Sequence, residues 1–462
     1  MSETLTPKVL VVGGGPGGYV AAIRAGQLGL DTVLVEADRL GGTCLVRGCI
    51  PSKALIHAAS LFAEVREAAT EKGRFGIHLD TAPRLDFLET RGWKDGIVDQ
   101  LSGGVAGLLR KAKVRVVHGW ARFSDAKSCS IETAEGVVTV HAEHVILATG
   151  SRPVELPFLP FGDRVLSSTE ALSLDAVPDR LVVVGAGYIG LELGTAFAKM
   201  DAKVSIVEAQ PHILPLYDRT LTAPVTRWLE KAGVDVHLGA KALGMVDDGL
   251  RIATVDGDEI VLPADKVLVT VGRAPLTEGW GLEEMALAMD GRFVKVDDRC
   301  ATSTTNVWAI GDLVGEPMLA HKASAQGEMV AEIIAGKNRR FDPVAIPAVC
   351  FTEPEIVSVG IDVADERHSV GQFPFQANGR ALSMDAGHDG GFVRTIAEES
   401  TGRIVGIQAV GQHISELSGE FAVLIEMGAT LEDVAAIIHA HPTLSEAAHE
   451  SGLKALGHAL HI

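Results

Sequence analysis

The stretch KVLVVGGGPGGYVAAIRAGQLGLDTVLVEA (residues 8–37) predicts an apolar strand, a G-x-G-x-x-G turn, a helix and a second apolar strand that ends in glutamate. Residues 180–209, RLVVVGAGYIGLELGTAFAKMDAKVSIVEA, repeat this pattern without a gap. In such a unit one glycine makes the turn, one lets the backbone approach a pyrophosphate, and one packs helix against strand. The residues concerned are Gly13, Gly15, Gly18 and Glu36 in the first copy, and Gly185, Gly187, Gly190 and Glu208 in the second.

Two such units predict an α/β protein with two Rossmann-like dinucleotide-binding domains. The pyrophosphate of each dinucleotide is expected at the positive end of a helix, and the terminal carboxylate is expected to accept hydrogen bonds from ribose hydroxyls. Glu208 would repel the 2′-phosphate of NADP, and the segment IVEAQPH (206–212) has no arginine to hold it. The second unit is therefore predicted to bind NAD.

Composition limits the remaining possibilities. The 462 residues are too many for one ordinary core, so three or four domains are expected. A net charge of −19 argues against nucleic acid or an anionic membrane surface as a partner. The apolar run at residues 181–198 holds Glu192 and four glycines, so a buried strand and helix explain it better than a membrane span. The first residues show no signal-peptide pattern, and a cytoplasmic protein is expected.

Two cysteines lie close together in GGTCLVRGCIPSK (residues 41–53). Cys44 and Cys49 would close only a short disulfide loop, which removes about 2 kcal/mol of chain entropy, and no other cysteine or histidine lies nearby to complete a zinc site. Redox-active thiols and inert free thiols both remain open on this ground. Pro51 predicts a helix start beside the sulfurs, and the positive helix end together with Lys53 would favour thiolate.

An ordered set of further motifs runs along the chain. These are ATGS (148–151), GAGYIGLELG (185–194), VGRAP (271–275), AIGD (309–312), AHKA (320–323) and HAHPTLSE (439–446). Together with the cysteine segment, they resemble the lipoamide dehydrogenases of the flavoprotein pyridine-nucleotide disulfide reductase family. The resemblance covers essentially the whole chain.

The resemblance implies four domains. These are an FAD-binding domain with the redox disulfide (1–151), an NAD-binding domain (152–272), a central domain that completes the FAD site (273–341), and a C-terminal α+β interface domain (342–462). In the family the last domain builds a homodimer.

The resemblance also implies a role for each matching residue. Cys44 matches the thiol that meets the substrate and Cys49 the thiol beside the flavin, while Lys53 and Glu192 match an ion pair near the reactive flavin nitrogen. His441 matches the base that acts on the other subunit's disulfide, and Glu446 could orient it. The implied FAD contacts are Gly13, Gly15, Gly18, Glu36, Lys53, Thr149, Gly150, Asp312 and Ala320, and the implied NAD contacts are Gly185, Gly187, Gly190, Glu208 and Gly272.

Some of these residues allow a second interpretation. His439 could replace His441 as the base, Asp312 could be an ordinary turn residue, and Tyr188 could either gate the nicotinamide pocket or simply pack at a helix start. A histidine metal pair at 439 and 441 is disfavoured because no further ligands accompany it, and no metal site is expected.

The implied reaction is oxidation of protein-bound dihydrolipoamide by NAD⁺ through the disulfide and FAD. The expected partners are a lipoyl domain and the dihydrolipoyl acyltransferase of a bacterial 2-oxo acid dehydrogenase complex. A glutathione-type reductase is the alternative enzyme, although that group typically has GCVPKK where this chain has GCIPSK. A flavin-bearing scaffold or redox sensor without turnover is the alternative of another class.

The chain departs from the family pattern at three places. Val46 and Arg47 follow Leu45 where the family usually has asparagine first, and a guanidinium that faced the sulfurs would lower a thiol pKa. AHKASAQG (320–327) replaces a commoner AHKAEDEG and favours a branched-chain oxo-acid complex. The other cysteines, Cys129, Cys300 and Cys350, have no partners at motif spacing and are predicted to be structural.

Overall fold

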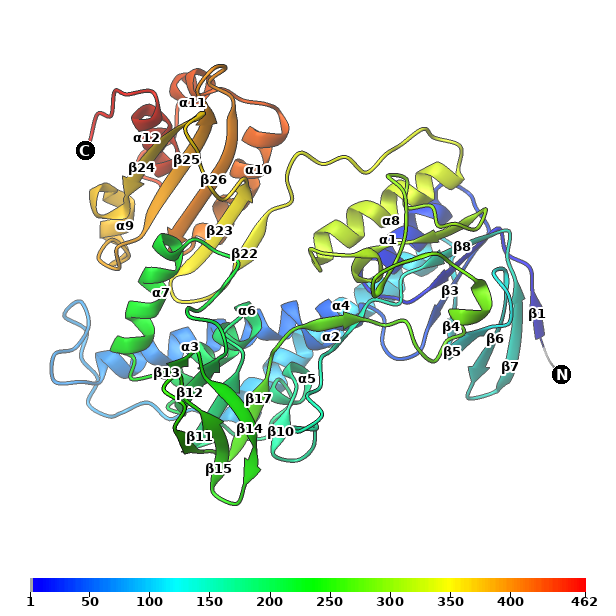
Figure 1. Cartoon of the computed structure of the whole chain (residues 1–462), viewed down its shortest axis with the longest axis horizontal. Helices are drawn as coiled ribbons and strands as arrows, with labels where there is room; N and C mark the ends of the chain where they lie inside the picture. Colours follow the sequence, from blue (N-terminus) through cyan, green and yellow to red (C-terminus); the bar gives the residue numbers. More distant parts are fainter. Residues whose placement is uncertain (1–2) are drawn as a thin grey trace.

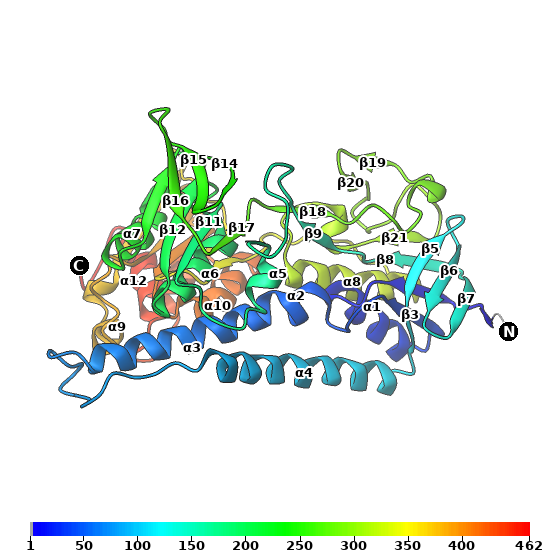
Figure 2. The ribbon, with the colours of Figure 1, turned by 90° about the horizontal axis from the view of Figure 1, so that it is seen from below.

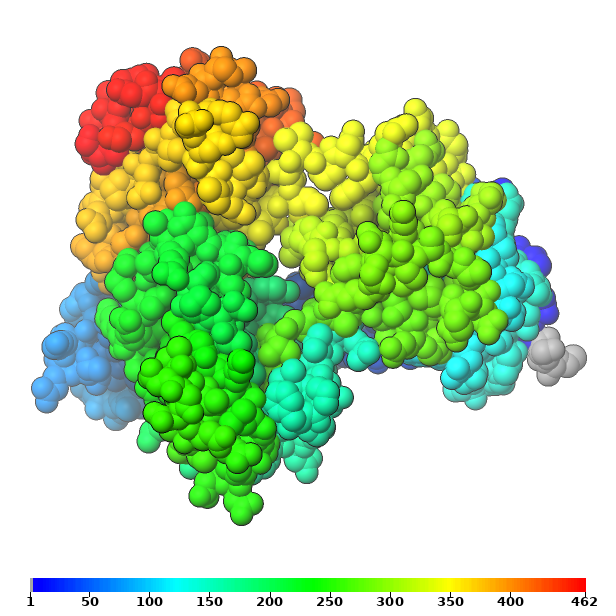
Figure 3. All heavy atoms as spheres, in the orientation of Figure 1, coloured from blue at the N-terminus to red at the C-terminus, as the bar shows by residue number. Residues whose placement is uncertain are grey.

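Three five-stranded sheets organise the part of the chain that the structure, a computed structural model, describes, which is residues 3–462. Two of the sheets are parallel and the third is antiparallel. Figure 1 shows the first sheet near the N-terminus, the second in the green segment and the third near the C-terminus. In the space-filling view the C-terminal part lies against the green second-sheet segment, and a hollow separates it from the part of the molecule that carries the N-terminus (Figure 3).

The first sheet has the strand order β21-β8-β2-β3-β4. Its inner strands are largely apolar and buried, as in parallel sheets covered on both faces, whereas the edge strand β4 exposes Arg115 and His118. Strand β21 pairs with β8 although a second sheet lies between them in sequence, so the chain returns to the first sheet after building the second. The strands are β2 (Val9–Val12), β3 (Thr32–Glu36), β4 (Arg115–His118), β8 (His144–Leu147) and β21 (Val307–Ala309).

Helices α1 (Pro16–Gln27) and α8 (Ala320–Ile334) pack together on one face of this sheet. Their backbones approach closely because Gly17 and Gly327 carry no side chain, and a Cβ on Gly327 would lie 2.3 Å from the carbonyl oxygen of Gly17. A four-stranded sheet joins the core of the other face. Its strands are β1 (Glu3–Leu5), β5 (Trp120–Phe123), β6 (Ser128–Thr133) and β7 (Gly136–His141).

The second sheet repeats the first glycine turn with the same backbone geometry. Gly13 and Gly185 both have φ 102°, and each turn joins a buried strand to a helix, as the sequence repeat predicts. The strand order is β10-β17-β11-β12-β13. The strands are β10 (Val165–Leu166), β11 (Arg180–Val184), β12 (Lys203–Glu208), β13 (Asp235–Leu238) and β17 (Lys266–Val269), with helices α6 (Tyr188–Lys199) and α7 (Arg219–Lys231) and the small sheet β14 (Lys241–Val246), β15 (Gly249–Ala253) and β16 (Glu259–Pro263).

Two short strands carry the chain between these sheets. Strand β9 (Ser151–Pro153) leaves the first sheet, and β18 (Arg273–Pro275) returns from the second. The two pair with each other in antiparallel register. Both passages of the chain therefore run side by side as one ribbon.

The third sheet is antiparallel, with the order β22-β23-β26-β25-β24. Its helices pack against it around a core of its own. The elements are β22 (Ala348–Cys350), β23 (Glu355–Gly360), β24 (His368–Pro374), β25 (Phe392–Glu398), β26 (Ile404–Gly411), α9 (Gly379–Ser383), α10 (Ser418–Glu426), α11 (Leu431–Ala436) and α12 (Glu446–Ala455).

Two long helices span the molecule beneath the sheets. Helix α3 (Cys49–Ala68) lies beside α4 (Phe87–Lys111) and also contacts α6 of the second sheet (Figure 2). The short helix α2 (Gly42–Arg47) precedes α3, so the cysteine segment joins two helices. The remaining short elements are α5 (Ser168–Ala171), β19 (Met289–Asp290), β20 (Phe293–Val294) and the 3₁₀ turns Glu283–Met285, Gly311–Val314, Phe375–Ala377 and Ile414–Leu417.

The predicted fold class is confirmed by two parallel, Rossmann-like sheets and a C-terminal α+β unit. The strands of the second sheet fall within 152–272 and those of the third within 342–462, but the domain boundaries themselves stay a prediction. Within residues 3–462, none of the helices combines the length and the apolar character needed to cross a membrane.

Glu332 is a buried carboxylate on α8 that ties this helix to α1 and to the loop after α8. Glu332 accepts hydrogen bonds from Arg24, from Lys337 at 2.8 Å and from Arg339 at 2.5 Å. The hydrogen bonds from Lys337 and Arg24 lower the pKa of Glu332 to about 2. Because the pKa of Glu332 is lower in the folded protein than in the unfolded chain, the ionised carboxylate stabilises the fold. This stabilisation is fully present at pH values above the ordinary pKa of 4.5, and it is lost as the pH falls toward 2.

We expect Glu332→Gln to cost about 2 kcal/mol at neutral pH, because it removes the charge that three cations share. Urea titration at pH 7 should give a lower midpoint than wild type, and the difference should shrink as the pH falls below 4.5. Glu328→Gln, on the exposed face of the same helix, is the control and should leave the midpoint unchanged. Equal midpoints for Glu332→Gln and the control would contradict this assignment.

Candidate active site

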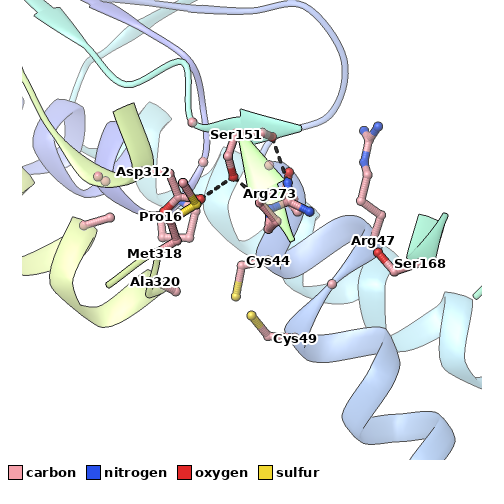
Figure 4. A pocket seen from close by; sticks show the side chains of 18 of the residues that line it. Pro16, Cys44, Arg47, Cys49, Ser151, Ser168, Arg273, Asp312, Met318 and Ala320 are labelled. Carbon is pink, nitrogen blue, oxygen red and sulfur yellow. Dashed lines mark hydrogen bonds between the residues drawn. The ribbon is translucent and has the colours of Figure 1, made fainter. Parts of the chain in front are cut away.

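A cavity of about 360 Å³ lies where the first glycine turn, the cysteine segment, the β9–β18 ribbon and helix α6 meet. Its size is in the range of small-molecule sites. Figure 4 shows both cysteines facing into this space, with Ser151, Arg273 and Asp312 on the opposite side. The cavity thus brings together residues from five distant parts of the sequence, within 13–17, 36–53, 148–193, 273–276 and 310–323.

The glycine turn at the cavity wall fits a bound pyrophosphate. A Cβ on Gly13 would lie 2.2 Å from the carbonyl oxygen of Ala148, and one on Gly18 would lie 1.8 Å from that of Gly13, so both positions exclude a side chain. A Cβ on Gly15 would have only Gly42 within 4 Å, at 3.9 Å, so this glycine faces open space at the start of α1. These three environments match the three expected glycine roles.

Glu36 ends β3 beside this turn and lines the cavity. Its carboxylate accepts hydrogen bonds from the backbone N–H of Gly14 at 2.6 Å and of Asp38 at 2.8 Å. Burial raises the pKa of Glu36, against the effect of the Gly14 hydrogen bond. The carboxylate is thereby fixed at the edge where a ribose would lie, and each oxygen keeps a further lone pair for a hydroxyl.

The second glycine turn copies these contacts but lies outside the cavity. Glu208 accepts hydrogen bonds from Ala186 at 2.7 Å and Gln210 at 2.8 Å. A Cβ on Gly190 would clash with the carbonyl oxygen of Gly185 at 2.1 Å, whereas one on Gly187 would meet nothing within 4 Å. The turn therefore offers the same room for a pyrophosphate as the first, at a separate site.

Four further predicted contact residues lie just before a strand or at the start of a helix. Gly150 and Gly272 have φ of 73° and 128°, and a Cβ on either would meet no atom within 4 Å. The Thr149 hydroxyl donates to the carbonyl oxygen of Leu276 at 3.0 Å, and Ala320 opens helix α8. All except Gly272 line the cavity.

Cys44 lies on α2, and Cys49 is the first residue of α3. Both are free thiols in this structure, and their sulfurs point toward each other (Figure 4). The Cys44 thiol donates a hydrogen bond to Cys49, which lowers the pKa of Cys49 to about 7, and Lys53 adds to this effect. The pKa of Cys44 is raised, chiefly by the same hydrogen bond. The pair is therefore asymmetric, with Cys49 as the thiolate.

Lys53 forms an ion pair with Glu192 beside this thiolate, and Glu192 opposes the effect of Lys53 on the pKa of Cys49. The Lys53 ammonium donates to Glu192 Oε2 at 2.8 Å and lies 4.4 Å from the centre of the Phe351 ring. The backbone N–H of Phe351 donates to Glu192 Oε1 at 3.0 Å. Phe351 follows strand β22, so the C-terminal unit helps to hold the pair in place. No pattern in the sequence pointed to Phe351.

Asp312 is held by a second network. The Ser151 hydroxyl donates to Asp312 Oδ2, and Arg273 donates to the Ser151 hydroxyl and carbonyl oxygen, each at 2.8 Å (Figure 4). Asp312 is therefore more than a turn residue, because its carboxylate is fixed toward the cavity. The motifs ATGS and VGRAP contain Ser151 and Arg273, but the sequence showed no reason to connect them.

His441 and Glu446 lie on the C-terminal unit and do not line the cavity. His441 donates through Nδ1 to Glu446 at 2.8 Å, and its side chain is 78% exposed. Burial raises the pKa of Glu446, but the hydrogen bonds from Thr443 and His441 outweigh this, and the net shift is downward. By contrast, His439 is only 10% exposed and is held by Glu420. The geometry thus favours His441 as the available imidazole.

The Arg47 guanidinium does not face the sulfurs, so the expected effect on a thiol pKa does not apply. The guanidinium pairs with Asp38 and points away from the two sulfurs (Figure 4). It lies near Glu36, where its charge opposes the rise in pKa that burial causes. The ion pair with Asp38, which sequence spacing did not reveal, turns the side chain toward the end of β3.

The remaining candidates behave more simply. Tyr188 opens α6 at the cavity wall and is 41% exposed, and its role as a gate stays a prediction. Cys129, Cys300 and Cys350 are buried, as expected of structural cysteines. Among the described residues, no group of three or more histidine, cysteine or carboxylate side chains could hold a metal.

Family models match nearly the whole chain. A pyridine nucleotide-disulphide oxidoreductase model covers residues 7–327, and the dimerisation domain of the same family covers residues 346–451. The chain belongs to the pyridine nucleotide-disulphide oxidoreductases. The dimerisation-domain match supports a homodimer, and flavin and pyridine nucleotide use follow from membership of this family.

Three curated relatives of this chain share one name. A dihydrolipoyl dehydrogenase of Pseudomonas aeruginosa is 57% identical over 100% of both chains. Enzymes of that name from Haloferax volcanii and Bacillus subtilis are 49% and 44% identical, each over 98% of this chain and 97% of the relative. These relatives confirm the predicted resemblance.

Solved structures agree with the fold. LpdA of Mycobacterium tuberculosis superposes with a TM-score of 0.87 at 27% identity, over 97% of this chain and 99% of the other. The HOCl-induced flavoprotein disulfide reductase RclA of Escherichia coli gives 0.83 at 25% identity, over 96% and 99%. The predicted arrangement of two dinucleotide-binding folds and a dimerisation unit is thus that of the oxidoreductase family.

The asymmetry of the two thiols can be tested in the reduced enzyme. The pH profile of iodoacetamide alkylation at Cys49 should have a midpoint near 7. Cys44→Ala removes the hydrogen bond that lowers this pKa, so the midpoint should rise toward the ordinary thiol value of about 8.5. Cys300→Ala, which removes a buried thiol elsewhere, is the control. An unchanged midpoint in Cys44→Ala would contradict the assignment.

Proposed function

We propose that this chain oxidises protein-bound dihydrolipoamide to lipoamide and reduces NAD⁺, as a dihydrolipoyl dehydrogenase. The observation that carries the proposal is a pair of facing thiols, with Cys49 the more acidic, on the wall of a cavity that the first glycine turn also borders. The names of the full-length relatives support the same activity.

The first glycine turn would hold FAD. Gly15 leaves room for the pyrophosphate at the helix start, Glu36 would bind the adenosine ribose, and Asp312 would bind a hydroxyl of the flavin side chain. Lys53 and Glu192 would flank the isoalloxazine ring near Cys49. When bound, FAD supplies two-electron transfer between the dithiol and NAD⁺.

The second glycine turn would hold NAD. Gly187 gives the pyrophosphate access to the start of α6, and Glu208 would accept hydrogen bonds from the adenosine ribose. The fixed carboxylate of Glu208 carries a negative charge where NADP would bring a second one.

The disulfide half of the reaction can be written as two exchanges. A thiolate of dihydrolipoamide attacks the Cys44 sulfur of the Cys44–Cys49 disulfide, and Cys49 leaves as a thiolate. The second dihydrolipoyl thiolate then attacks the sulfur that is bound to Cys44, which releases the Cys44 thiol and the cyclic lipoyl disulfide. The low pKa of Cys49 makes it the better leaving group. The enzyme gains two electrons, and the substrate loses two electrons and two protons.

His441 would take the proton from the incoming thiol. Its Nε2 is free to face a substrate because Glu446 holds Nδ1. His441 of one chain does not line that chain's own cavity, so in the homodimer it would serve the dithiol of the other chain. A monomer would therefore lack the base.

The remaining assignments rest on the same proposal. The partners would be a lipoyl domain and the dihydrolipoyl acyltransferase of a 2-oxo acid dehydrogenase complex, with AHKASAQG (320–327) favouring a branched-chain complex. The compartment would be the bacterial cytoplasm, whose reducing thiol pool suits a cycling dithiol. The four domains would be those predicted at 1–151, 152–272, 273–341 and 342–462.

An assay of NAD⁺ reduction by dihydrolipoamide tests the proposal directly. Steady turnover with dihydrolipoamide and none with glutathione would support it. Reduction of glutathione disulfide by NADPH would instead identify a glutathione-type reductase, and a flavin-loaded protein without turnover on either substrate would identify a scaffold or redox sensor.

Nucleotide preference gives the second test. The negative charge of Glu208 predicts a kcat/KM for NAD⁺ at least about tenfold above that for NADP⁺. Both nucleotides should be measured on the same preparation with saturating dihydrolipoamide. Equal values, or a preference for NADP⁺, would refute the assignment of Glu208.

His441→Gln should lower dihydrolipoamide turnover by roughly 10²–10⁴, the usual contribution of general acid–base catalysis. Reduction of the bound flavin by NADH should change far less, because that half of the reaction does not need the base. His388→Gln, which replaces an exposed histidine of the same C-terminal unit, is the control. Unimpaired turnover in His441→Gln would transfer the role to another group, with His439 the first to examine.

A further inference from the structure

The β9–β18 ribbon carries both passages of the chain between the two dinucleotide-binding sheets. Its register pairs Ser151 with Pro275, Arg152 with Ala274, and Pro153 with Arg273. Whatever fixes this ribbon also fixes the position from which the second sheet begins and ends. The ribbon borders the cavity, so it is linked to the flavin side of the protein as well.

Arg273 ties the ribbon together through its side chain. Its Nε and Nη2 donate to the hydroxyl and carbonyl oxygens of Ser151, each at 2.8 Å. The Ser151 hydroxyl in turn donates to Asp312, which lies on the 3₁₀ turn Gly311–Val314. A guanidinium presents its donors in a fixed planar fork, so it sets the geometry of both groups that it binds.

Three neighbouring groups stabilise the charged form of Arg273. Burial lowers the pKa of Arg273, and Asp312, Tyr188 and Cys49 oppose this effect by favouring the cation. A charge that is partly removed from water is stabilised by its partners. Removing it leaves those partner groups without their compensating interaction. Arg273 and these three residues line the same cavity.

Arg152 provides a contrast on the same ribbon. Its side chain is 50% exposed, and its ion pair with Glu278 spans 3.5 Å. It is close to Arg273 in the ladder but does not line the cavity. The two arginines therefore separate the effect of a positive charge on the ribbon from the effect of the half-buried network of Arg273, Ser151 and Asp312.

We propose that Arg273 is a positioning residue that holds the Asp312 carboxylate and the NAD-binding unit in one fixed relation through Ser151. This extends the proposed function, because it rests on FAD lying against Asp312 and NAD against the second glycine turn. Loss of the guanidinium frees Ser151 to rotate, which loosens Asp312, and at the same time removes the tie between the two passages of the chain. Both cofactor sites weaken together as a result.

The test compares Arg273→Met with Arg152→Met in the holoenzyme. The first measurement is the rate of flavin release at a fixed temperature, followed by the rise in flavin fluorescence. The second is the dissociation constant of NADH, from the concentration dependence of flavin reduction in stopped flow. We expect Arg273→Met to raise each by a factor of roughly 5 or more, as for linked sites, and Arg152→Met to leave both close to wild type.

Each other outcome overturns the proposal. Faster flavin release alone would mean that Arg273 serves Asp312 only, and weaker NADH binding alone would mean that it serves the nucleotide side only. Arg273→Met equal to Arg152→Met in both measurements would remove any positioning role. A drop in the global unfolding temperature by circular dichroism that accounts for both changes would make the residue merely structural.

A second variant covers the case in which Arg273→Met does not fold with flavin. Ser151→Ala keeps the guanidinium and removes only the hydroxyl that joins it to Asp312. It should speed flavin release and weaken NADH binding in the same direction, and no change in either would overturn the proposal. Neither measurement uses a lipoyl substrate, so a failure of the dihydrolipoamide assay would not be confused with a failure here.

Discussion

The missing side chains at the two glycine turns are the constraint on which the molecule depends. Gly18 and Gly190 let a helix lie against the strand that precedes it, at distances where a Cβ would overlap a carbonyl oxygen. Gly15 and Gly187 leave the start of each helix open toward a ligand. The same close approach builds the core of each sheet and leaves the room that the proposed dinucleotides would occupy, so under this proposal the fold and cofactor binding depend on the same positions.

The dithiol and its charged neighbours are held by contacts between segments that are distant in the sequence. The dithiol lies at the junction of α2 and α3, and α3 runs beside α6 of the second sheet. Lys53 on α3 meets Glu192 on α6, and Phe351 from the C-terminal unit closes this pair. A thiol with a pKa near 7 is maintained at this meeting point because a hydrogen bond and a cation both favour its charged form.

The sequence predicted the elements that repeat or that follow local rules. The strand–turn–helix units, Glu36 and Glu208 at their strand ends, and Cys49 at a helix start all came from spacing along the chain. Contacts between distant segments were harder to foresee. Ser151, Arg273 and Phe351 act through partners more than a hundred residues away, and no periodic pattern marks such pairs. The sequence left the direction of Arg47 open for the same reason, since its ion pair with Asp38 sets that direction.

The proposed reaction requires electrons to pass between the Cys44–Cys49 pair and the nicotinamide, and NADH can drive this transfer in the reverse direction. The most direct measurement is differential alkylation of the oxidised holoenzyme before and after anaerobic addition of NADH, with the modified cysteines identified by peptide mapping. Two new thiols, at Cys44 and Cys49, should appear only after NADH, while Cys129, Cys300 and Cys350 stay unchanged. Equal labelling of Cys44 and Cys49 before and after NADH, or new thiols at other positions, would contradict this account.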